Sequence, residues 1–280
     1  MSTRVCLCGE SQFVLVHAYT RPPQGETRFL PDANRYRRTI WRCEQCGHFV
    51  SAHDMNLQKF YEGAYVDATY GPDGLEEAFN RINALDETES DNVNRVRRIL
   101  RFSETHFSDR QGRSVLDVGS GLCVFLYRMR EAGWDCTAVD PDVRAVQHAE
   151  EVVGVRGVCG DFMTLSELGR FDLVTFNKVL EHVENPVAML SRGRDFVGAE
   201  GVVYVELPDG ECAAREGFQR EEFFLEHLHI FSMDSMTRLA ELAGYRVVSS
   251  ERLREPSSKF TLRAFLAPDN TASDQSWCDD

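Results

Sequence analysis

The sequence has no long apolar run and no excess of basic residues. No uninterrupted apolar stretch of the 280-residue chain approaches the roughly 18 residues that a membrane span requires, and the start MSTRVCLCGE lacks the apolar core of a secretory signal. We therefore expect a cytoplasmic globular protein without a membrane partner. The net charge of -14 also disfavours nucleic acid as a partner, because phosphate binding relies on clustered lysine and arginine.

Without an export signal, the nine cysteines are expected to be reduced thiols or metal ligands, because the cytosol opposes structural disulfides. Four of them stand singly inside or beside apolar runs and are expected to be small buried hydrophobes. These are Cys123, Cys136, Cys159 and Cys212. Four others form two short pairs near the N-terminus.

Residues 1–58 are predicted to form a small zinc-ribbon-like module. The segment lacks long helical periodicity and holds too little apolar sequence to fold unaided. The pairs C-x-C-G and C-x-x-C-G resemble zinc knuckles, and a tetrahedral zinc site would supply the missing folding free energy. The expected ligands are Cys6, Cys8, Cys43 and Cys46. Because the first pair departs from C-x-x-C, His48 or His53 is the alternative to Cys6.

Residues 59–102 are predicted to be an aromatic linker followed by a helix from about residue 75 to 102. Tyr61, Tyr65 and Tyr70 of the linker either shape a sugar or cofactor pocket or pack between two domains. This segment is expected to pack onto the domain that follows.

Residues 103–267 are predicted to form the main domain, and from residue 113 onward strand-like and helical segments alternate. This alternation predicts parallel strands joined by right-handed crossovers, and hence a doubly wound, Rossmann-like α/β sheet. Two final strand-like segments, YRVVSSERL and SSKFTLRAFLA, are expected to form a closing hairpin. Residues 268–280 are polar and are expected to be a disordered tail.

The run SVLDVGSGLC ends a predicted strand on two glycines. Gly119 and Gly121 permit a tight turn and the close approach of a ligand, and Asp117 can accept hydrogen bonds from that ligand. Because open α/β sheets bind ligands at the carboxyl ends of their strands, this turn is the expected cofactor site. Dinucleotide-binding domains use a third glycine to seat a pyrophosphate, and here Cys123 replaces it.

The next strand ends carry further polar residues. Asp140 ends the second strand, about 20 residues after the glycines, where an acidic side chain can bind both hydroxyls of a ribose. Asp161 and Phe162 follow the third strand and can contact an adenine ring. Asn177 ends the fourth strand.

This ordered set resembles the class I S-adenosylmethionine-dependent methyltransferases over about residues 95–267. The resemblance implies a seven-stranded sheet with an antiparallel last strand. In chain order, the resemblance implies contacts to the amino-acid part, the ribose and the adenine of the cofactor, followed by a contact at the end of the fourth strand. They are Asp117, Gly119, Gly121, Asp140, Asp161, Phe162 and Asn177.

The stretch FFLEHLHIFS, residues 223–232, resembles the segment that supplies a catalytic base in sugar C-methyltransferases. His227 is the expected base, and Glu226 is the alternative proton acceptor. Phe224 stands where those enzymes often place a tyrosine. The H-x-H-x-F-S pattern also occurs in this superfamily as a structural segment.

The stretch KVLEH, residues 178–182, resembles the E-x-x-E-H motif of metal-dependent 2'-O-methyltransferases of small RNAs and of quinone-pathway O-methyltransferases. Lys178 replaces the first glutamate, and its ammonium would repel a divalent cation. Glu181 and His182 are therefore expected to line the methyl-transfer end of the cavity, or to cap a helix, without a catalytic metal. His182 is a further candidate catalytic residue.

An N-terminal cysteine module before such a domain resembles methyltransferases of deoxysugar and surface-polysaccharide pathways. The sequence thus predicts an S-adenosylmethionine-dependent methyltransferase with structural zinc, acting on a nucleotide-linked sugar or a polysaccharide-pathway intermediate. The alternatives are a metal-assisted O-methyltransferase of another small molecule, a nicotinamide-dependent sugar oxidoreductase and a non-catalytic zinc-ribbon binding protein. The incomplete glycine pattern disfavours the oxidoreductase, and the overall acidity disfavours an RNA-binding module.

Overall fold

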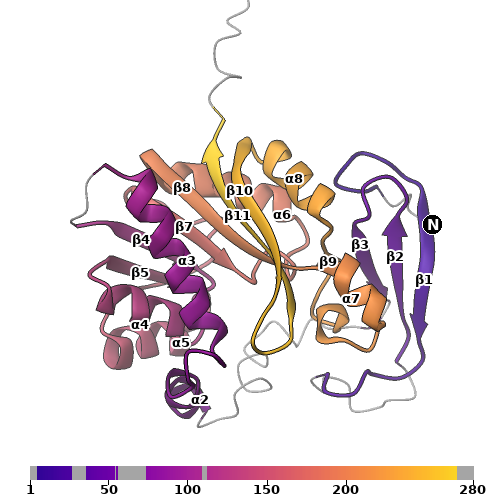
Figure 1. Ribbon diagram of the computed structural model, residues 1–280, viewed down its shortest axis with the longest axis horizontal. Coiled ribbons are helices and arrows are strands. Elements are labelled where there is room, and N and C mark those ends of the chain that lie inside the picture. The colour runs from indigo at the N-terminus through magenta and orange to yellow at the C-terminus, as the bar shows by residue number, and fades with distance from the viewer. Residues whose placement is uncertain (1–4, 27–35, 54, 56–73, 109–111, 270–280) are drawn as a thin grey trace, which may run out of the picture.

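The computed structural model describes residues 5–26, 36–53, 55, 74–108 and 112–269. These residues form a large sheet flanked by helices and a small sheet to one side of it (Figure 1). In this part of the chain, no helix is both long enough and apolar enough to cross a membrane. Tyr61, Tyr65, Tyr70 and the tail from residue 270 onward lie outside the described residues.

The large sheet has seven strands in the order β10-β11-β8-β7-β4-β5-β6. They are β4 (Ser114–Val118), β5 (Asp135–Asp140), β6 (Arg156–Cys159), β7 (Phe171–Asn177), β8 (Val197–Pro208), β10 (Tyr245–Arg254) and β11 (Phe260–Pro268). Pairings from β8 to β6 are parallel, and β11 runs antiparallel to both of its neighbours. The predicted doubly wound sheet, its closing hairpin and its antiparallel last strand are therefore confirmed.

Helices cover both faces of this sheet. The α-helices of the described residues are α2 (Gly74–Asn83), α3 (Asp91–His106), α4 (Val124–Glu131), α5 (Val143–His148), α6 (Pro186–Arg192), α7 (Gly210–Glu216) and α8 (Met233–Leu242). The described residues also form a short π-helix, η3 (Ala149–Val153), and two short 3-10 helices, η4 (Gly193–Phe196) and η5 (Glu221–Phe223). Val115 and Leu116, adjacent on β4, belong to different hydrophobic clusters because side chains alternate along a strand. One cluster includes residues of α3 and α4, and the other includes residues of α6 and α8.

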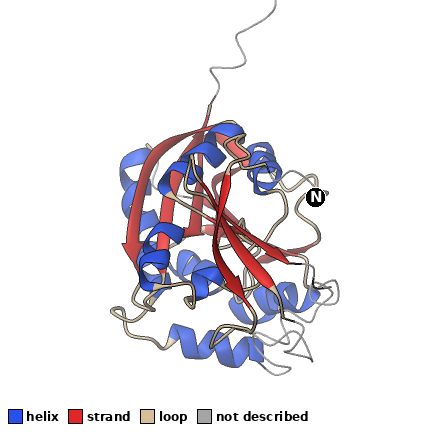
Figure 2. Cartoon of the chain, turned by 90° about the vertical axis from the view of Figure 1, so that its right-hand side faces the viewer, coloured by secondary structure: helices blue, strands red, loops and turns tan. Residues whose placement is uncertain are grey.

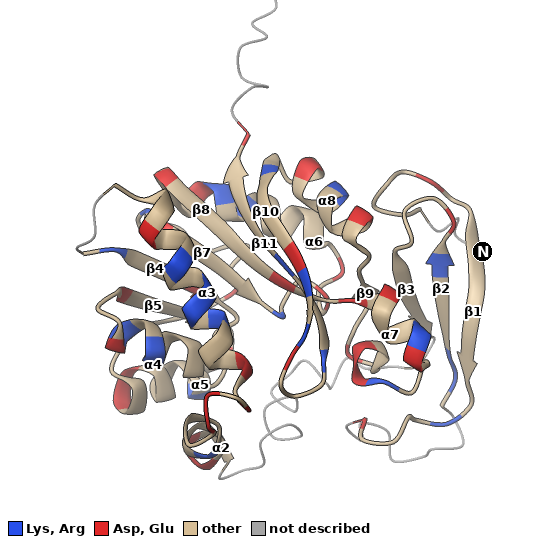
Figure 3. Cartoon of the chain, viewed as in Figure 1, with Lys and Arg blue, Asp and Glu red and all other residues tan. Residues whose placement is uncertain are grey.

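The helix predicted from about residue 75 to 102 is wrong in one respect, because the structure has two helices there. The polar segment between them ends at Ser90, whose side chain accepts a hydrogen bond of 3.3 Å from the backbone N–H of Val93. A serine in this position satisfies an unpaired N–H of the first turn, so it begins a new helix. Acidic and basic side chains are interspersed along α3, as they are along α8 (Figure 3).

The small sheet has the order β1-β2-β3-β9, with antiparallel pairings throughout. Its strands are β1 (Phe13–Tyr19), β2 (Arg38–Cys43), β3 (Phe49–His53) and β9 (His229–Ile230). Figure 2 views the chain from the side on which β1, β2 and β3 lie. Phe223, Leu225 and Ile230 share a buried cluster with Ile40 and Phe49. The N-terminal strands therefore pack around the FFLEHLHIFS segment, which is distant from them in the sequence.

Candidate active site

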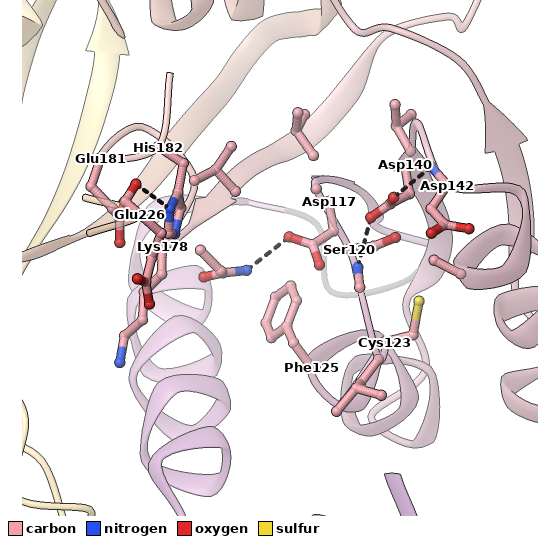
Figure 4. A pocket seen from close by; sticks show the side chains of 18 of the residues that line it. Asp117, Ser120, Cys123, Phe125, Asp140, Asp142, Lys178, Glu181, His182 and Glu226 are labelled. Carbon is pink, nitrogen blue, oxygen red and sulfur yellow. Dashed lines mark hydrogen bonds between the residues drawn. The ribbon is translucent and has the colours of Figure 1, made fainter. Parts of the chain in front are cut away.

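A cavity of about 1720 Å³ opens at the carboxyl ends of the parallel strands. Asp117, Asp140 and Asp161, which follow or end three different strands, all line it. The cavity continues to His182 and His227. Figure 4 shows Asp117 and Asp140 in one half and His182 in the other. The structure thus brings the expected cofactor residues and the expected catalytic residues to one space.

Asp117 is buried at the end of β4 and is fixed by two donors from β7. Its Oδ1 accepts hydrogen bonds from Thr175 Oγ1 at 2.6 Å and from Asn177 Nδ2 at 2.8 Å. Burial raises the pKa of Asp117 to about 6, against the lowering effect of these two donors. Both donors bind Oδ1, and no described residue donates a hydrogen bond to Oδ2. Oδ2 can therefore accept a hydrogen bond from a ligand.

The glycine turn is built as the sequence predicts. Gly119 has φ +69°, and a Cβ there would lie 2.8 Å from Val179 Cγ2, so a side chain cannot be accommodated without a shift. Gly121 has φ +49°, and its N–H donates to Asp140 Oδ2 at 2.9 Å. Cys123, where the third glycine is missing, also has a left-handed φ of 55° at the start of α4. The turn therefore keeps a conformation that favours glycine although cysteine occupies the position.

Asp140 holds this turn and also lines the cavity. Each of its carboxylate oxygens accepts one backbone N–H, from Gly121 and from Asp142, both at 2.9 Å. Each oxygen of a carboxylate can accept a second hydrogen bond. Asp140 therefore fixes the loop and retains acceptor capacity toward a ligand with two hydroxyls.

Asp161 and Phe162 follow β6 and both line the cavity, but they differ in environment. Asp161 is exposed, and its Oδ1 accepts the N–H of Met163 at 2.9 Å. Phe162 is buried and packs edge-on against Phe176 at 5.7 Å between ring centroids. Phe162 therefore forms a fixed apolar wall, because its ring is part of the core.

Lys178 follows β7 with a left-handed φ of 60°, which is uncommon for a residue with a side chain. Its N–H donates to the carbonyl of Glu206 at 3.1 Å, which fixes the turn. The side chain lines the cavity, where burial lowers the pKa of Lys178 and repulsion from Lys259 adds to this effect. Figure 4 shows the Lys178 ammonium away from the group of Glu181, His182 and Glu226.

The two candidate histidines lie with their ring centroids 4.9 Å apart. His227 Nδ1 lies 2.9 Å from the carbonyl of Glu222, and His182 Nδ1 lies 3.0 Å from the carbonyl of Glu226. A carbonyl only accepts, so in each case Nδ1 carries the proton, and Nε2 of His227 keeps its lone pair. Burial lowers the pKa of His182 to about 4, and burial together with His182 lowers that of His227.

Two glutamates accompany the histidines. Burial raises the pKa of Glu181 to about 8 and that of Glu226 to about 7. An oxygen of each carboxyl, Oε2, is buried without a hydrogen-bond partner among the described residues. Glu181, His182 and His227 each offer a possible ligand atom, and these atoms lie within 4.8 Å of one another. The half of the cavity that contains His182 and His227, called the far half below, can thus accept protons, or it can hold a cation.

The segment that carries His227 is held from two sides. The backbone N–H groups of Leu228 and His229 donate to the carbonyl of Glu181, at 2.8 and 3.2 Å. From the small sheet, the N–H of Ser51 donates to the carbonyl of Leu228 at 3.0 Å. The position of His227 therefore depends on both sheets.

A buried ion pair of the small sheet adds a further support that the sequence analysis missed. Glu26 pairs with Arg38 at 3.1 Å and accepts a hydrogen bond of 2.7 Å from the Tyr36 hydroxyl. The same carboxylate accepts the N–H of Leu225 at 2.8 Å. No local pattern marks Glu26, since its partners lie on other segments.

The sequence analysis also missed a charged network beside the cavity. Glu206 is buried on β8, where it pairs with Arg95 and, at 2.8 Å, with Arg263. The two guanidinium groups lower the pKa of Glu206 although burial opposes them. Arg95 also lines the cavity. The signal in the sequence was a single glutamate inside the apolar run GVVYVELP.

The four N-terminal cysteines converge. Their sulfur atoms lie within 4.8 Å of one another, with Cys6 and Cys46 Sγ at 3.4 Å and Cys8 and Cys43 Sγ at 3.6 Å. His48, the alternative ligand, instead places its ring nitrogens 3.2 Å from Ser235 Oγ and 3.0 Å from His229 Nδ1.

The prediction that four isolated cysteines are buried is wrong for two of them. Cys123 and Cys136 are buried, whereas Cys159 is exposed and Cys212 is half-buried. Cys159 ends the edge strand β6, which is covered less completely than the central strands. Position within an apolar run therefore did not predict burial at the edge of the sheet.

A family model described as a methyltransferase domain matches residues 89–250. A ubiquinone biosynthesis O-methyltransferase of Methylococcus capsulatus is 25% identical over 161 residues, which are 55% of this chain and 61% of that protein. One of Bordetella avium is 33% identical over 101 residues, covering 34% of this chain and 42% of that protein. The chain thus spans less than two thirds of the length of these curated relatives.

Solved structures show the same fold. A 1,6-didemethyltoxoflavin-N1-methyltransferase of Burkholderia thailandensis, with S-adenosylhomocysteine bound, has a TM-score of 0.54 and 16% identity. The match covers 86% of this chain and 98% of that one. The family match favours methyl transfer over the nicotinamide-dependent alternative. The chain belongs to the methyltransferase domain family.

Proposed function

We propose that this enzyme methylates a small polar acceptor held in the half of the cavity that His182, Glu226 and His227 line. One observation carries the proposal. The cavity that contains Asp117 and Asp140 continues without a break to these proton-accepting side chains. A donor and an acceptor bound at its two ends would therefore share one space, which is what methyl transfer requires.

The first half fits S-adenosylmethionine, which supplies an electrophilic methyl group when bound. Asp117 has an oxygen available for the ammonium of the amino-acid part, and Asp140 has acceptor capacity for the ribose hydroxyls. Asp161 and Phe162 would contact the adenine. Side-chain oxygens of Asn177 and Ser120 that line the cavity are buried without a hydrogen-bond partner among the described residues, so they remain for the ligand.

His227 is the proposed proton acceptor. The carbonyl of Glu222 holds its Nδ1 proton, so Nε2 can take a proton from the acceptor. Glu181 has a possible ligand atom within 4.8 Å of one on His227 and, above its pKa of about 8, would stabilise the resulting imidazolium as a carboxylate. Glu226 is the alternative base, and His182 would orient His227 through its ring contact.

The proposed acceptor is a nucleotide-linked sugar or a related polysaccharide-pathway intermediate. The support is the resemblance of FFLEHLHIFS to the base segment of sugar C-methyltransferases and the packing of the N-terminal module around that segment. Mass spectrometry with labelled S-adenosylmethionine and a panel of nucleotide sugars tests this. We expect label transfer to one of them, a loss of at least about 100-fold in His227→Ala, and wild-type turnover in the control His106→Ala, whose ring is exposed. Label transfer to none of the sugars would refute the acceptor class, and unchanged turnover in His227→Ala would refute the base.

A metal-assisted O-methyltransferase of another small molecule is the second candidate. The ligand atoms of Glu181, His182 and His227 within 4.8 Å of one another favour it, as do the names of the curated relatives. Lys178, which lines the same cavity, opposes it, because its positive charge disfavours a cation there. Turnover that survives chelation favours the base, whereas turnover that chelation abolishes and manganese restores favours the metal.

We also propose that Cys6, Cys8, Cys43 and Cys46 hold a structural zinc ion. Sulfur–zinc distances of about 2.3 Å in a tetrahedron place neighbouring sulfurs about 3.8 Å apart. In the structure, the two shortest separations given, 3.4 and 3.6 Å, are close to this value. The zinc would stabilise the N-terminal strands, and through β3 and β9 it would support the His227 segment.

A further inference from the structure

The chain holds three lysines, Lys59, Lys178 and Lys259, among 31 lysines and arginines. Two of the three, Lys178 and Lys259, line the cavity described above. Arginine supplies nearly all the other cations of the chain, so lysine is not the default basic residue here. Two compact ammonium groups in one cavity of a protein with a net charge of -14 form a feature that the transfer reaction itself does not explain.

The surrounding carboxylates do not neutralise Lys178. Among the described residues, no carboxylate oxygen lies within 4.0 Å of its ammonium, which is the limit for an ion pair. Glu206 pairs with Arg95 and Arg263 and also accepts the Tyr204 hydroxyl at 2.7 Å. The charge of Glu206 is therefore already compensated.

Two other glutamates nearby, Glu255 and Glu222, are also engaged by arginines. Glu255 pairs with Arg263 at 2.5 Å, and Glu222 makes two hydrogen bonds of 2.9 Å with Arg220. Lys259 pairs with Glu221 at 3.3 Å, and each of the two side chains is more than one third exposed. A ligand can therefore compete for Lys259, since exposed ion pairs contribute little.

The backbone also holds Lys178 in this place. Its left-handed φ of 60° is costly for a residue with a side chain, and the hydrogen bond to the Glu206 carbonyl maintains it. Asparagine or glycine would fit this conformation better. Local backbone preference therefore does not explain the presence of lysine at this position.

We infer that Lys178 and Lys259 bind an anionic substituent of the methyl acceptor, either a phosphate or a carboxylate. This deepens the proposed function, because it takes the far half of the cavity as the acceptor site. A charged group on the acceptor would pair with the uncompensated ammonium of Lys178 and displace Glu221 from Lys259. A nucleoside diphosphate carries such a group, and so does an aromatic or sugar acid.

Calorimetry of the full chain saturated with S-adenosylhomocysteine tests the inference, with pyrophosphate and 4-hydroxybenzoate as separate probes. We expect at least one probe to bind, with Kd raised at least about tenfold in Lys178→Asn and severalfold in Lys259→Gln. The control Arg156→Gln removes an exposed charge that does not line the cavity and should change Kd less than about twofold. Tighter binding of pyrophosphate would assign a phosphate, and tighter binding of 4-hydroxybenzoate would assign a carboxylate.

Affinity for S-adenosylhomocysteine separates the possible failures. In Lys178→Asn it should stay within about twofold of wild type, and this also shows that the variant is folded. An equal loss for S-adenosylhomocysteine would mean that Lys178 serves the carboxylate of the cofactor, which would overturn the inference. Binding of neither probe, or equal weakening by Arg156→Gln, would overturn it as well. A wild-type chain that binds no S-adenosylhomocysteine would instead refute the proposed function.

Discussion

Glu26 accepts a hydrogen bond of 2.8 Å from the backbone N–H of Leu225, a residue 199 positions later in the chain. Leu225 lies two residues before the proposed base His227. The contact therefore joins the N-terminal sheet to the segment that carries the base, and it shows how a module without catalytic residues of its own can position one.

Glu26→Gln should lower the free energy of unfolding by about 3 kcal/mol, because Arg38 would remain buried without its counter-charge. Urea denaturation measures this change. Tyr36→Phe removes one hydrogen bond to the same carboxylate and keeps the ion pair, so it should cost only about 1 kcal/mol. Equal stability of Glu26→Gln and wild type would show that the buried pair supports nothing.

Binding of S-adenosylhomocysteine should weaken in acid because of Asp117. Its pKa of about 6 means that the carboxyl is increasingly protonated below that pH and loses its charge for an ammonium ligand. The Kd should be constant above about pH 7 and rise by up to about tenfold per pH unit well below pH 6. Calorimetry across this range measures it. In Asp117→Asn the Kd should be higher at neutral pH and almost independent of pH, and an equally steep profile in the variant would contradict the assignment.

The same carboxylate should cost the protein stability. Burial raises the pKa of Asp117 from 3.8 to about 6, so the folded state holds the proton more tightly than the unfolded state. Its contribution to the free energy of unfolding is therefore lost as pH rises from about 4 to 6. Asp117→Asn should be more stable than wild type at pH 7 by about 1–3 kcal/mol while binding the cofactor less well. If Asp117→Asn were less stable than wild type at pH 7, the hydrogen bonds from Thr175 and Asn177 would favour the charged carboxylate of Asp117 more than burial disfavours it.

Removal of zinc should unfold the N-terminal strands before the large sheet. The purified chain should contain one zinc per molecule by elemental analysis, and Cys43→Ser should lose it and lower Tm by at least about 5 °C. Turnover should fall because β3 pairs with β9, next to His227, while binding of S-adenosylhomocysteine persists. Cys159→Ser is the matched control, because this exposed cysteine does not belong to the cluster. Protein free of zinc but with the wild-type Tm would contradict a structural role.

Local patterns predicted which residues the structure gathers around the glycine turn at the strand ends. Asp117, Gly119 and Gly121 follow one another at a strand end, and the fold places the next strand ends beside them, so one segment after another indicates the site. The position of Asp140 was predicted in this way, and the structure adds that it also ties the glycine turn. Cys123 shows the limit of such prediction, because a cysteine at this position gives no indication of the left-handed φ that the structure has there.

Features that depend on contacts between distant segments could not be predicted. Strand β9 is only two residues long and has no periodicity, yet it joins the base segment to the N-terminal sheet. Glu26 and Leu225 meet through tertiary packing, for which neither residue carries a local signal. The isolation of Lys178 also depends on pairings made elsewhere, since Arg263 occupies the carboxylates of Glu206 and Glu255.

The most direct test of the account is a calorimetric titration of the full chain with S-adenosylhomocysteine, carried out beside Asp140→Asn and Asp135→Asn. The account predicts one site per wild-type chain, a loss of at least about tenfold in affinity for Asp140→Asn, and no change for Asp135→Asn, whose exposed carboxylate lies at the start of β5, outside the cavity. Binding that is unaffected by Asp140→Asn, or equally weakened by Asp135→Asn, would contradict it.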